Sequence, residues 1–259
     1  MTIDFKLGRL PSPTDNRDLK AARYLSALPS PPGWVNYTAR MADKPWPMFD
    51  NDKIGDCAIA STGHHVFAWT LNSRGKAVKL SSTTILRRYE EVSGYVPGDE
   101  STDVGCNMRD VLKRWLKEPL GDHHLTAFAR IEVPEQISIT SMTNFQTSIW
   151  VFGGVYLGFD LPVSAQGQIQ RGEPWTITSG ADAAKGSWGG HAVACLGYSA
   201  DGVEIITWGR RQLVAWSFLA AYCDEAWGLI SADWLKGSFS PDGFNLAQLR
   251  TDLASLRAG

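Results

Sequence analysis

One cysteine and one histidine have the setting of a thiol nucleophile and its base. Cys57 follows a Gly-Asp turn and begins an apolar stretch with helical spacing. The N-terminus of a helix presents free N–H groups and the positive end of the helix dipole, which stabilise a thiolate. His191 follows two glycines and precedes an apolar strand that would fix its imidazole. The alternatives stay open, because a lone cysteine is more often a small buried hydrophobe and such a histidine is often a satisfied core residue.

Helices are expected in the first half of the chain and strands in the second. Helical spacing and turn signals predict helices over residues 18–25, 57–73, 81–93 (capped by Ser81 or Ser82) and 107–117. Val, Ile and aromatic residues predict strands over 128–133, 152–160, 191–199, 203–208 and 226–231, with helices at 141–150 and 213–223. This order indicates an α+β protein with two segregated halves.

The N-terminal fifth of the chain differs in composition from the rest. Residues 1–50 are rich in proline and predict an extended arm laid over the surface of one domain. We expect the domain to span 51–259, with a left lobe at about 51–127, a right lobe at about 128–235 and a C-terminal tail at 236–259.

Composition excludes several classes of function. The 259 residues are 44% hydrophobic and 20% charged, with a formal net charge of -2, so neither nucleic acid nor a membrane is an expected partner. The N-terminus lacks the pattern of a cleaved signal peptide, which predicts a protein that is cytoplasmic when made or is exported by a route without a cleaved signal. No cofactor or metal is expected, because there is no Cys-x-x-Cys pair and the adjacent histidines 64–65 and 123–124 lack partners at ligand spacing. All four cysteines are expected to be free thiols.

Three segments resemble the active-site segments of papain-like cysteine peptidases. They are DNDKIGDCAIAS around Cys57, GGHAVACLGY around His191, and EIITWG. The 134 residues between the cysteine and the histidine (191 − 57 = 134) fall within the roughly 130–150 typical of that family. Further stretches between residues 8 and 235 resemble bacterial and viral members in the same order, including TDNRD, GWVNYT, TDVGCNMRDVLKRWLKEPLG and SMTNFQTSIWVFGGVYLGFDLP. The resemblance implies a papain-like two-lobed fold, with a helical left lobe, an antiparallel-sheet right lobe and a cleft between them.

The resemblance assigns roles to four residues. Cys57 matches the nucleophile and His191 the base that forms an ion pair with it. Asn51 lies six residues before the cysteine, where the family keeps the glutamine of the oxyanion hole, and its amide is the same donor on a shorter arm. Trp208 matches the indole that shields the hydrogen bond of the histidine, although a core tryptophan beside a turn fits equally well.

The residue that orients the histidine departs from the family pattern. Ile206 aligns with the family asparagine and cannot accept a hydrogen bond. Thr207 is adjacent and has a hydroxyl, but its side chain is expected on the opposite face of the strand, which makes it a doubtful orienter. Loss of an orienter can leave a slow enzyme.

A second departure is Asp56, which stands beside the nucleophile where serine is usual. Together with Asp50 and Asp52, it would raise the pKa of the cysteine and disfavour the thiolate. The acidic segment would alternatively select a cationic substrate, and the simplest interpretation is a solvated loop.

The remaining candidate residues would line the substrate cleft. Trp188 is a groove wall or a core residue, and Cys106 resembles a family cysteine whose bridging partner is replaced here by Ile54. The cleft residues expected from the resemblance are Gly55, Asp56, Gly105, Asn107, Trp188, Gly189 and Gly190.

Three functions remain open from the sequence. The first is a cysteine peptidase or amide hydrolase acting on a peptide or protein, and a variant of it acts on peptidoglycan peptides. The alternative is a catalytically weak or inactive papain-like module that binds other proteins, for example a phage virion or tail component. Only 56 residues precede Cys57 and much of that length is needed as the arm, so no long pro-segment is expected and control by other means is predicted.

Overall fold

The computed structural model describes residues 5–22, 30–41, 44–133, 139–234 and 251. Three helices form one half of the molecule: α2 (Cys57–Arg74), α3 (Ser82–Ser93) and α4 (Met108–Lys117). They confirm the three helices predicted there to within one or two residues. Ser81 caps α3 as expected, because its hydroxyl accepts a hydrogen bond from the backbone of Thr84 at 3.0 Å.

Helix α2 lies between the other two helices and the sheet. It contacts α3, α4 and strand β6, and most of its residues are buried on every side. A helix that is apolar all round belongs in a core rather than at a surface. Trp69 of α2 stacks on Trp115 of α4 with ring centroids 6.1 Å apart. None of the described helices combines the length and hydropathy that a membrane span requires.

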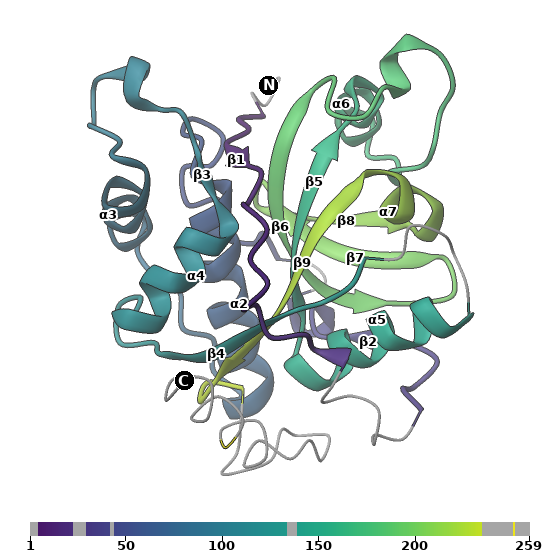
Figure 1. Cartoon of the computed structure of the whole chain (residues 1–259), viewed down its shortest axis with the longest axis horizontal. Helices are drawn as coiled ribbons and strands as arrows, with labels where there is room; N and C mark the ends of the chain where they lie inside the picture. Colours follow the sequence, from purple (N-terminus) through teal and green to yellow (C-terminus); the bar gives the residue numbers. More distant parts are fainter. Residues whose placement is uncertain (1–4, 23–29, 42–43, 134–138, 235–250, 252–259) are drawn as a thin grey trace.

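The other half is built on a seven-stranded antiparallel sheet (Figure 1). The strand order is β4-β9-β5-β6-β7-β8, and β2 pairs with β6 outside this path. The strands are β2 (Val35–Asn36), β4 (Leu125–Arg130), β5 (Val155–Leu161), β6 (Gly189–Tyr198), β7 (Gly202–Thr207), β8 (Arg210–Ala215) and β9 (Cys223–Ser231). Helices α5 (Ile139–Phe152) and α7 (Trp216–Tyr222) contact strands of the sheet, and α6 (Val163–Gln170) follows β5. Helices therefore dominate the first half of the chain and strands the second, which confirms the α+β class.

One prediction about this half was wrong, and one helix was not predicted. The stretch 213–223 is not one helix, because β8 ends at Ala215 and α7 begins at Trp216. Burial alternates along β8, as in a strand with one covered face, whereas the prediction counted its apolar residues toward a helix. Helix α6 was missed because its sequence, VSAQGQIQ, is mostly polar and contains a glycine. The helix expected at 18–25 is absent over residues 18–21, where Lys20 instead pairs with Arg130 in a β-bridge, and residues 23–25 lie outside the described ranges.

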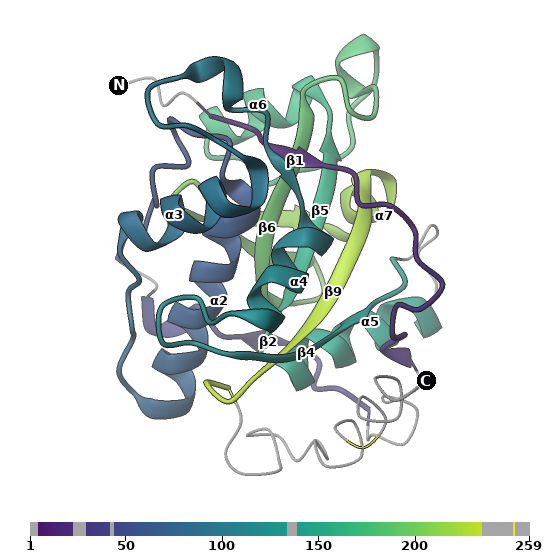
Figure 2. The same cartoon turned by 60° about the vertical axis from the view of Figure 1, so that its left-hand side comes forward.

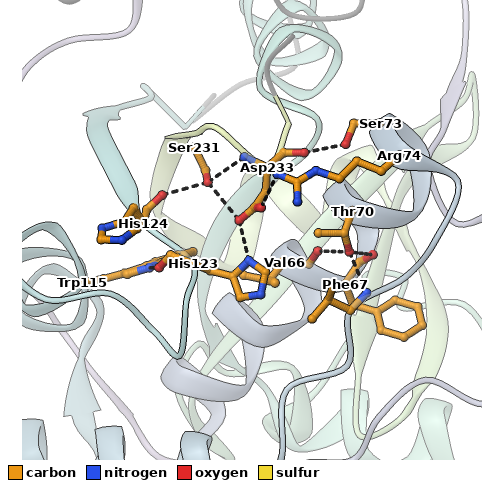
Figure 3. A network of polar contacts seen from close by, with 11 residues as sticks. Val66, Phe67, Thr70, Ser73, Arg74, Trp115, His123, His124, Ser231 and Asp233 are labelled. Carbon is orange, nitrogen blue, oxygen red and sulfur yellow. Dashed lines mark hydrogen bonds and ion pairs between the residues drawn. The ribbon is translucent and has the colours of Figure 1, made fainter. Parts of the chain in front are cut away.

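A polar network ties the end of β9 to the helical half (Figure 3). The carboxylate of Asp233 receives the Arg74 guanidinium at 3.0 Å and shares a hydrogen bond of 2.7 Å with His123 Nδ1. The Ser73 hydroxyl donates to the Asp233 carbonyl, and Trp115 donates its indole N–H to the His123 carbonyl. His123 therefore serves as a structural tie between the two halves.

Candidate active site

His191 is held between two side chains from the end of β7 and the turn after it. Its Nε2 shares a hydrogen bond of 2.7 Å with Thr207 Oγ1. Its ring stacks on Trp208, with centroids 4.1 Å apart and planes 7° apart. The expectation that Thr207 points away from the histidine is therefore wrong, and the expected contact between Trp208 and the imidazole is present.

Strand register explains the error about Thr207. Ala194 and Ile206 are paired, so their side chains share one face of the sheet. His191 lies three residues before Ala194 and Thr207 lies one residue after Ile206, so alternation places both on the other face. Ile206 packs instead against Trp46 and neighbouring apolar side chains.

A tight turn brings the tryptophan onto the histidine ring. Thr207 pairs with Arg210, which leaves Trp208 and Gly209 as a two-residue hairpin loop. Both have positive φ, 42° and 71°, as the favoured two-residue hairpin turns of type I′ require. The hairpin thus presents Thr207 and Trp208 together to His191.

Cys57 begins α2 and is fully buried in this arrangement. Burial raises the pKa of its thiol to about 12, the charge of Asp56 adds to the rise, and backbone hydrogen bonds from Ala192 and Gly8 oppose it. Burial lowers the pKa of His191 to about 3, and the positive charge of Arg9 acts in the same direction. Both groups are therefore neutral at neutral pH. Within the described part of the chain, His191 Nδ1 has no hydrogen-bond partner.

Two polar residues of the loop before α2, Asn51 and Asp56, are buried, whereas Lys53 is exposed. The side-chain amide of Asn51 donates to the Ile54 carbonyl at 3.2 Å, so its role in an oxyanion hole remains a prediction. Asp56 is only 1% exposed, and neither of its carboxylate oxygens has a hydrogen-bond partner among the described residues. Burial raises the pKa of Asp56 well above its usual value, Asp50 and Asp103 add to the rise, and the nearby Asn51 amide opposes it. A solvated loop was therefore the wrong interpretation for Asp56.

Residues 5–10, named here the cleft segment, run between the helical half and the sheet (Figures 1 and 2). Gly8 donates its N–H to the Gly190 carbonyl at 3.3 Å, and its own carbonyl accepts from the Cys106 N–H at 2.9 Å. Strand β1 (Arg9–Leu10) pairs in parallel with β3 (Cys106–Asn107). The cleft segment is therefore hydrogen-bonded to both sides at once.

The predicted cleft glycines lie against this segment. A Cβ atom added at Gly105 would lie 2.0 Å from the Gly8 carbonyl oxygen, and one at Gly190 would lie 2.1 Å from that of Arg9. A Cβ atom at Gly55 would lie 3.0 Å from the Leu7 carbonyl oxygen, and one at Gly189 would lie 2.9 Å from the Leu7 side chain. The expectation that the first fifty residues form only an outer arm was therefore incomplete, because part of them fills the predicted cleft.

Aromatic contacts fix the start of the cleft segment. The ring of Phe5 packs on Trp208 with centroids 4.7 Å apart and against Trp188 at 6.2 Å. The indole N–H of Trp208 donates to the Lys6 carbonyl at 3.1 Å. Trp188 thus forms a wall of this part of the cleft. Asn107, at the other end, caps α4 by accepting from the Asp110 N–H at 2.8 Å.

The sequence analysis missed Asp103, which joins the two glycine loops. Its carboxylate accepts from the Gly55 N–H at 3.0 Å and from the Tyr89 hydroxyl at 2.7 Å, and it pairs with Lys6 Nζ at 3.2 Å. Tyr89 in turn accepts from the Gly105 N–H at 2.9 Å. An aspartate in a Gly- and Asp-rich loop gave no signal that separated it from a solvated turn residue. All four cysteines are buried free thiols.

Solved structures with the same fold are cysteine proteases and their precursors. Neither protein-family models nor curated protein sequences match the chain. Xylellain, a cysteine protease from Xylella fastidiosa, is 15% identical, and the match covers 88% of this chain and 97% of that chain with a TM-score of 0.62. A digestive procathepsin L 3 of Tenebrio molitor is 14% identical over 88% of this chain and 76% of that chain, with a TM-score of 0.54. A procathepsin B from Trypanosoma congolense is 8% identical over 89% and 88%, with a TM-score of 0.56.

These likenesses extend over nearly the whole described chain, and their identities are low enough that they bear on the fold alone. They agree with the segregated helical and sheet halves of this chain. The chain has the fold of papain-like cysteine proteases.

Proposed function

We propose that the chain is a cysteine peptidase or related amide hydrolase, with Cys57 as nucleophile and His191 as base. The observation that carries the proposal is the setting of His191. One ring nitrogen is bonded to Thr207, the ring is covered by Trp208, and the other nitrogen has no partner in the described structure. A base that is oriented on one side and free on the other is what a thiol nucleophile requires.

The proposed reaction uses the tautomer in which His191 Nε2 carries the proton and donates it to Thr207. The Nδ1 lone pair then accepts the thiol proton while Cys57 Sγ bonds to the substrate carbonyl carbon. The carbon–nitrogen bond breaks as His191 returns that proton to the leaving amine. Water attacks the resulting thioester and gives a proton to His191. The carbon–sulfur bond then breaks, the acid product leaves and the thiol is restored. The N–H groups at the start of α2 and the Asn51 amide are the proposed donors to the oxyanion.

The arrangement described above is proposed to be a latent one. The cleft segment buries Cys57 and His191, and burial is the largest cause of both pKa shifts. A neutral thiol beside a neutral imidazole is a poor nucleophile. Displacement of the segment would admit water and substrate together and would favour the charged pair.

A binding module without catalysis is the second candidate. It is favoured by the filled cleft and by Asp56, whose buried carboxyl would oppose a thiolate if it ionised. In that case the cleft segment is a permanent part of the fold, and the chain would act through its surface on other proteins.

Labelling with an epoxide inhibitor of papain-type enzymes separates the two candidates. We expect one adduct on Cys57 in the intact mass of the full chain, formed slowly in the wild type and faster when the cleft segment is displaced. Cys57→Ala and His191→Ala should abolish it. An unlabelled Cys57 in a variant whose cleft is shown to be open would refute the peptidase and leave the binding module.

A further inference from the structure

Three carboxylates surround the guanidinium group of Arg9 at the centre of the cleft segment. Arg9 Nη1 lies 3.1 Å from Asp160 Oδ1, and Nη2 lies 2.8 Å from Asp224 Oδ2 and 3.1 Å from Glu225 Oε2. Arg9 is 3% exposed, and its Nε is buried without a partner among the described residues. An arginine so deeply buried needs paired charges, which this pocket supplies.

A β-bulge builds the acidic pocket. Gly158 of β5 pairs with Glu225 of β9, and the next residue, Phe159, pairs with Cys223. Asp224 is therefore the extra residue on the bulged strand. Consecutive side chains of a regular strand point to opposite faces, and the bulge is what lets Asp224 and Glu225 reach the same guanidinium.

The pocket is shaped for a long, flat cation. A Cβ atom added at Gly158 would lie 2.5 Å from Arg9 Nε and 2.8 Å from Met108 Sδ, so only glycine leaves room there. Glu225 is held in place because its Oε1 accepts from the Trp227 indole at 2.7 Å. The wall formed by Gly158 and Met108 is thus apolar and fits the aliphatic stem of a basic side chain. The carboxylates at the far end of the pocket carry the negative charge.

The pocket adjoins the candidate catalytic pair. Gly158 is the strand partner of Ala192, the residue after His191, and neighbouring strands lie about 5 Å apart. Gly8, which precedes Arg9, is hydrogen-bonded to Gly190, the residue before His191, and its backbone is close enough to the Cys57 thiol to act toward a lower pKa of that thiol. A ligand that binds as the cleft segment does would put its basic side chain in the place of Arg9. The neighbouring residue of that ligand would then lie over Cys57, in the place of Gly8.

Removal of Arg9 would leave the pocket with uncompensated negative charge. The nearby Arg130 lies over the ring of Trp227 and donates to the backbone carbonyl of Asp224, so its charge is directed away from the carboxylates. We propose that the pocket of Asp160, Asp224 and Glu225 is a specificity subsite for a guanidinium or ammonium side chain, and that Arg9 occupies it in place of a basic residue of the substrate. This assignment rests on the proposed peptidase only for the cleavage of that substrate, since cation binding does not require catalysis.

Binding is tested first, in the full chain and without any need for catalysis. Arg9→Ala empties the pocket, and Arg17→Ala is the matched control because Arg17 is an exposed arginine of the same N-terminal region. The probes are N-acetyl-arginine amide and its neutral analogue N-acetyl-citrulline amide. We expect the arginine probe to raise the thermal midpoint of Arg9→Ala saturably at millimolar concentration and the citrulline probe to leave it unchanged. Adding Asp224→Asn and Glu225→Gln should remove the effect. Equal shifts by both probes, an equal shift in Arg17→Ala, or no shift in Arg9→Ala would overturn the assignment.

Cleavage is tested with two sets of fluorogenic peptides, one that varies only the residue before and one that varies only the residue after the residue placed over Cys57. For Arg9→Ala we expect arginine to be preferred over citrulline by at least about tenfold in kcat/KM, and the preference to be lost with Asp224→Asn and Glu225→Gln. Cleavage without this preference would overturn the subsite and leave the peptidase intact. A thermal shift specific to the arginine probe, without any cleavage, would support the cation site and count against the peptidase.

Discussion

Thr207 Oγ1 lies 2.7 Å from His191 Nε2, at the position where an orienting amide would otherwise be required. The hydroxyl can accept the Nε2 proton, which fixes both the tautomer and the plane of the ring. The indole of Trp208 stacks on the imidazole, and its proposed role is to shield this hydrogen bond from water. The isoleucine at position 206 therefore does not deprive the histidine of a partner.

Replacement of Thr207 tests this orienting role. Thr207→Val should lower the second-order rate constant for epoxide labelling of Cys57 about fivefold, because one hydrogen bond contributes about 1 kcal/mol. It should also lower the free energy of unfolding by about 1–3 kcal/mol, because Nε2 is left buried without a partner. Thr207→Ser keeps the hydroxyl and should restore most of the labelling rate. Equal rates in the valine and serine variants would show that the hydroxyl does not orient the base.

Displacement of the cleft segment should expose Cys57. A side chain at Gly8 would collide with the Gly55 carbonyl, since its Cβ would lie only 1.9 Å from that oxygen. Gly8→Val should therefore lower stability by about 1–3 kcal/mol and shift the segment out of the cleft. Faster hydrogen exchange of the Cys106 amide, which donates to the Gly8 carbonyl, would report the displacement.

Gly33→Val is the matched control for this variant, because a Cβ atom at Gly33 meets nothing within 4 Å. We expect labelling of Cys57 to rise in Gly8→Val and to stay at the wild-type level in Gly33→Val. If Gly8→Val loses the protection of the Cys106 amide and Cys57 still reacts at the wild-type rate, the latent arrangement is wrong.

Asp56 predicts an unusual dependence of stability on pH. Its pKa is raised in the folded protein, so the folded state keeps a proton that the unfolded chain releases above about pH 4. This residue therefore costs more stability as pH rises from about 4 toward 7. Asp56→Asn should raise the free energy of unfolding by about 1–3 kcal/mol at pH 7, and the gain should shrink toward zero near pH 4. Urea unfolding at several pH values measures this change in the free energy of unfolding. Asp122→Asn, at an exposed position, is the control for the change in net charge. A loss of stability at pH 7 would contradict the prediction.

The sequence predicted the elements better than it predicted the contacts of the candidate site. The apolar spacing after Cys57 and the continuous apolar run after His191 carry enough local information to place α2 and β6. The orienting role of Thr207 depends on the register of β6 against β7, which no local pattern encodes. The inward position of Asp56 depends on how the loop before α2 packs, and its two neighbouring carboxylates, Asp50 and Asp52, suggested solvent instead.

The acidic pocket was beyond the reach of the sequence for a similar reason. Asp160 lies on β5 and Asp224 and Glu225 lie on β9, so strand pairing and a bulge unite residues that are more than sixty positions apart. Arg9 joins them from the other end of the chain. A proline-rich beginning indicates an extended segment, but it does not indicate which surface the segment covers.

The pH dependence of Cys57 alkylation by iodoacetamide tests the central claim most directly, with peptide mapping to separate Cys57 from the other cysteines. The wild type should react slowly from pH 5 to 8, because the pKa of the thiol is about 12 and that of His191 is about 3 while the cleft is filled. In Gly8→Val the rate should reach a plateau by about pH 6, and His191→Ala in the same background should move the rise to above about pH 8. The contradicting result is an alkylation rate that rises only above about pH 8 both with and without His191, in a Gly8→Val background whose Cys106 amide exchanges freely. It would contradict the thiolate–imidazolium pair and with it the proposed peptidase.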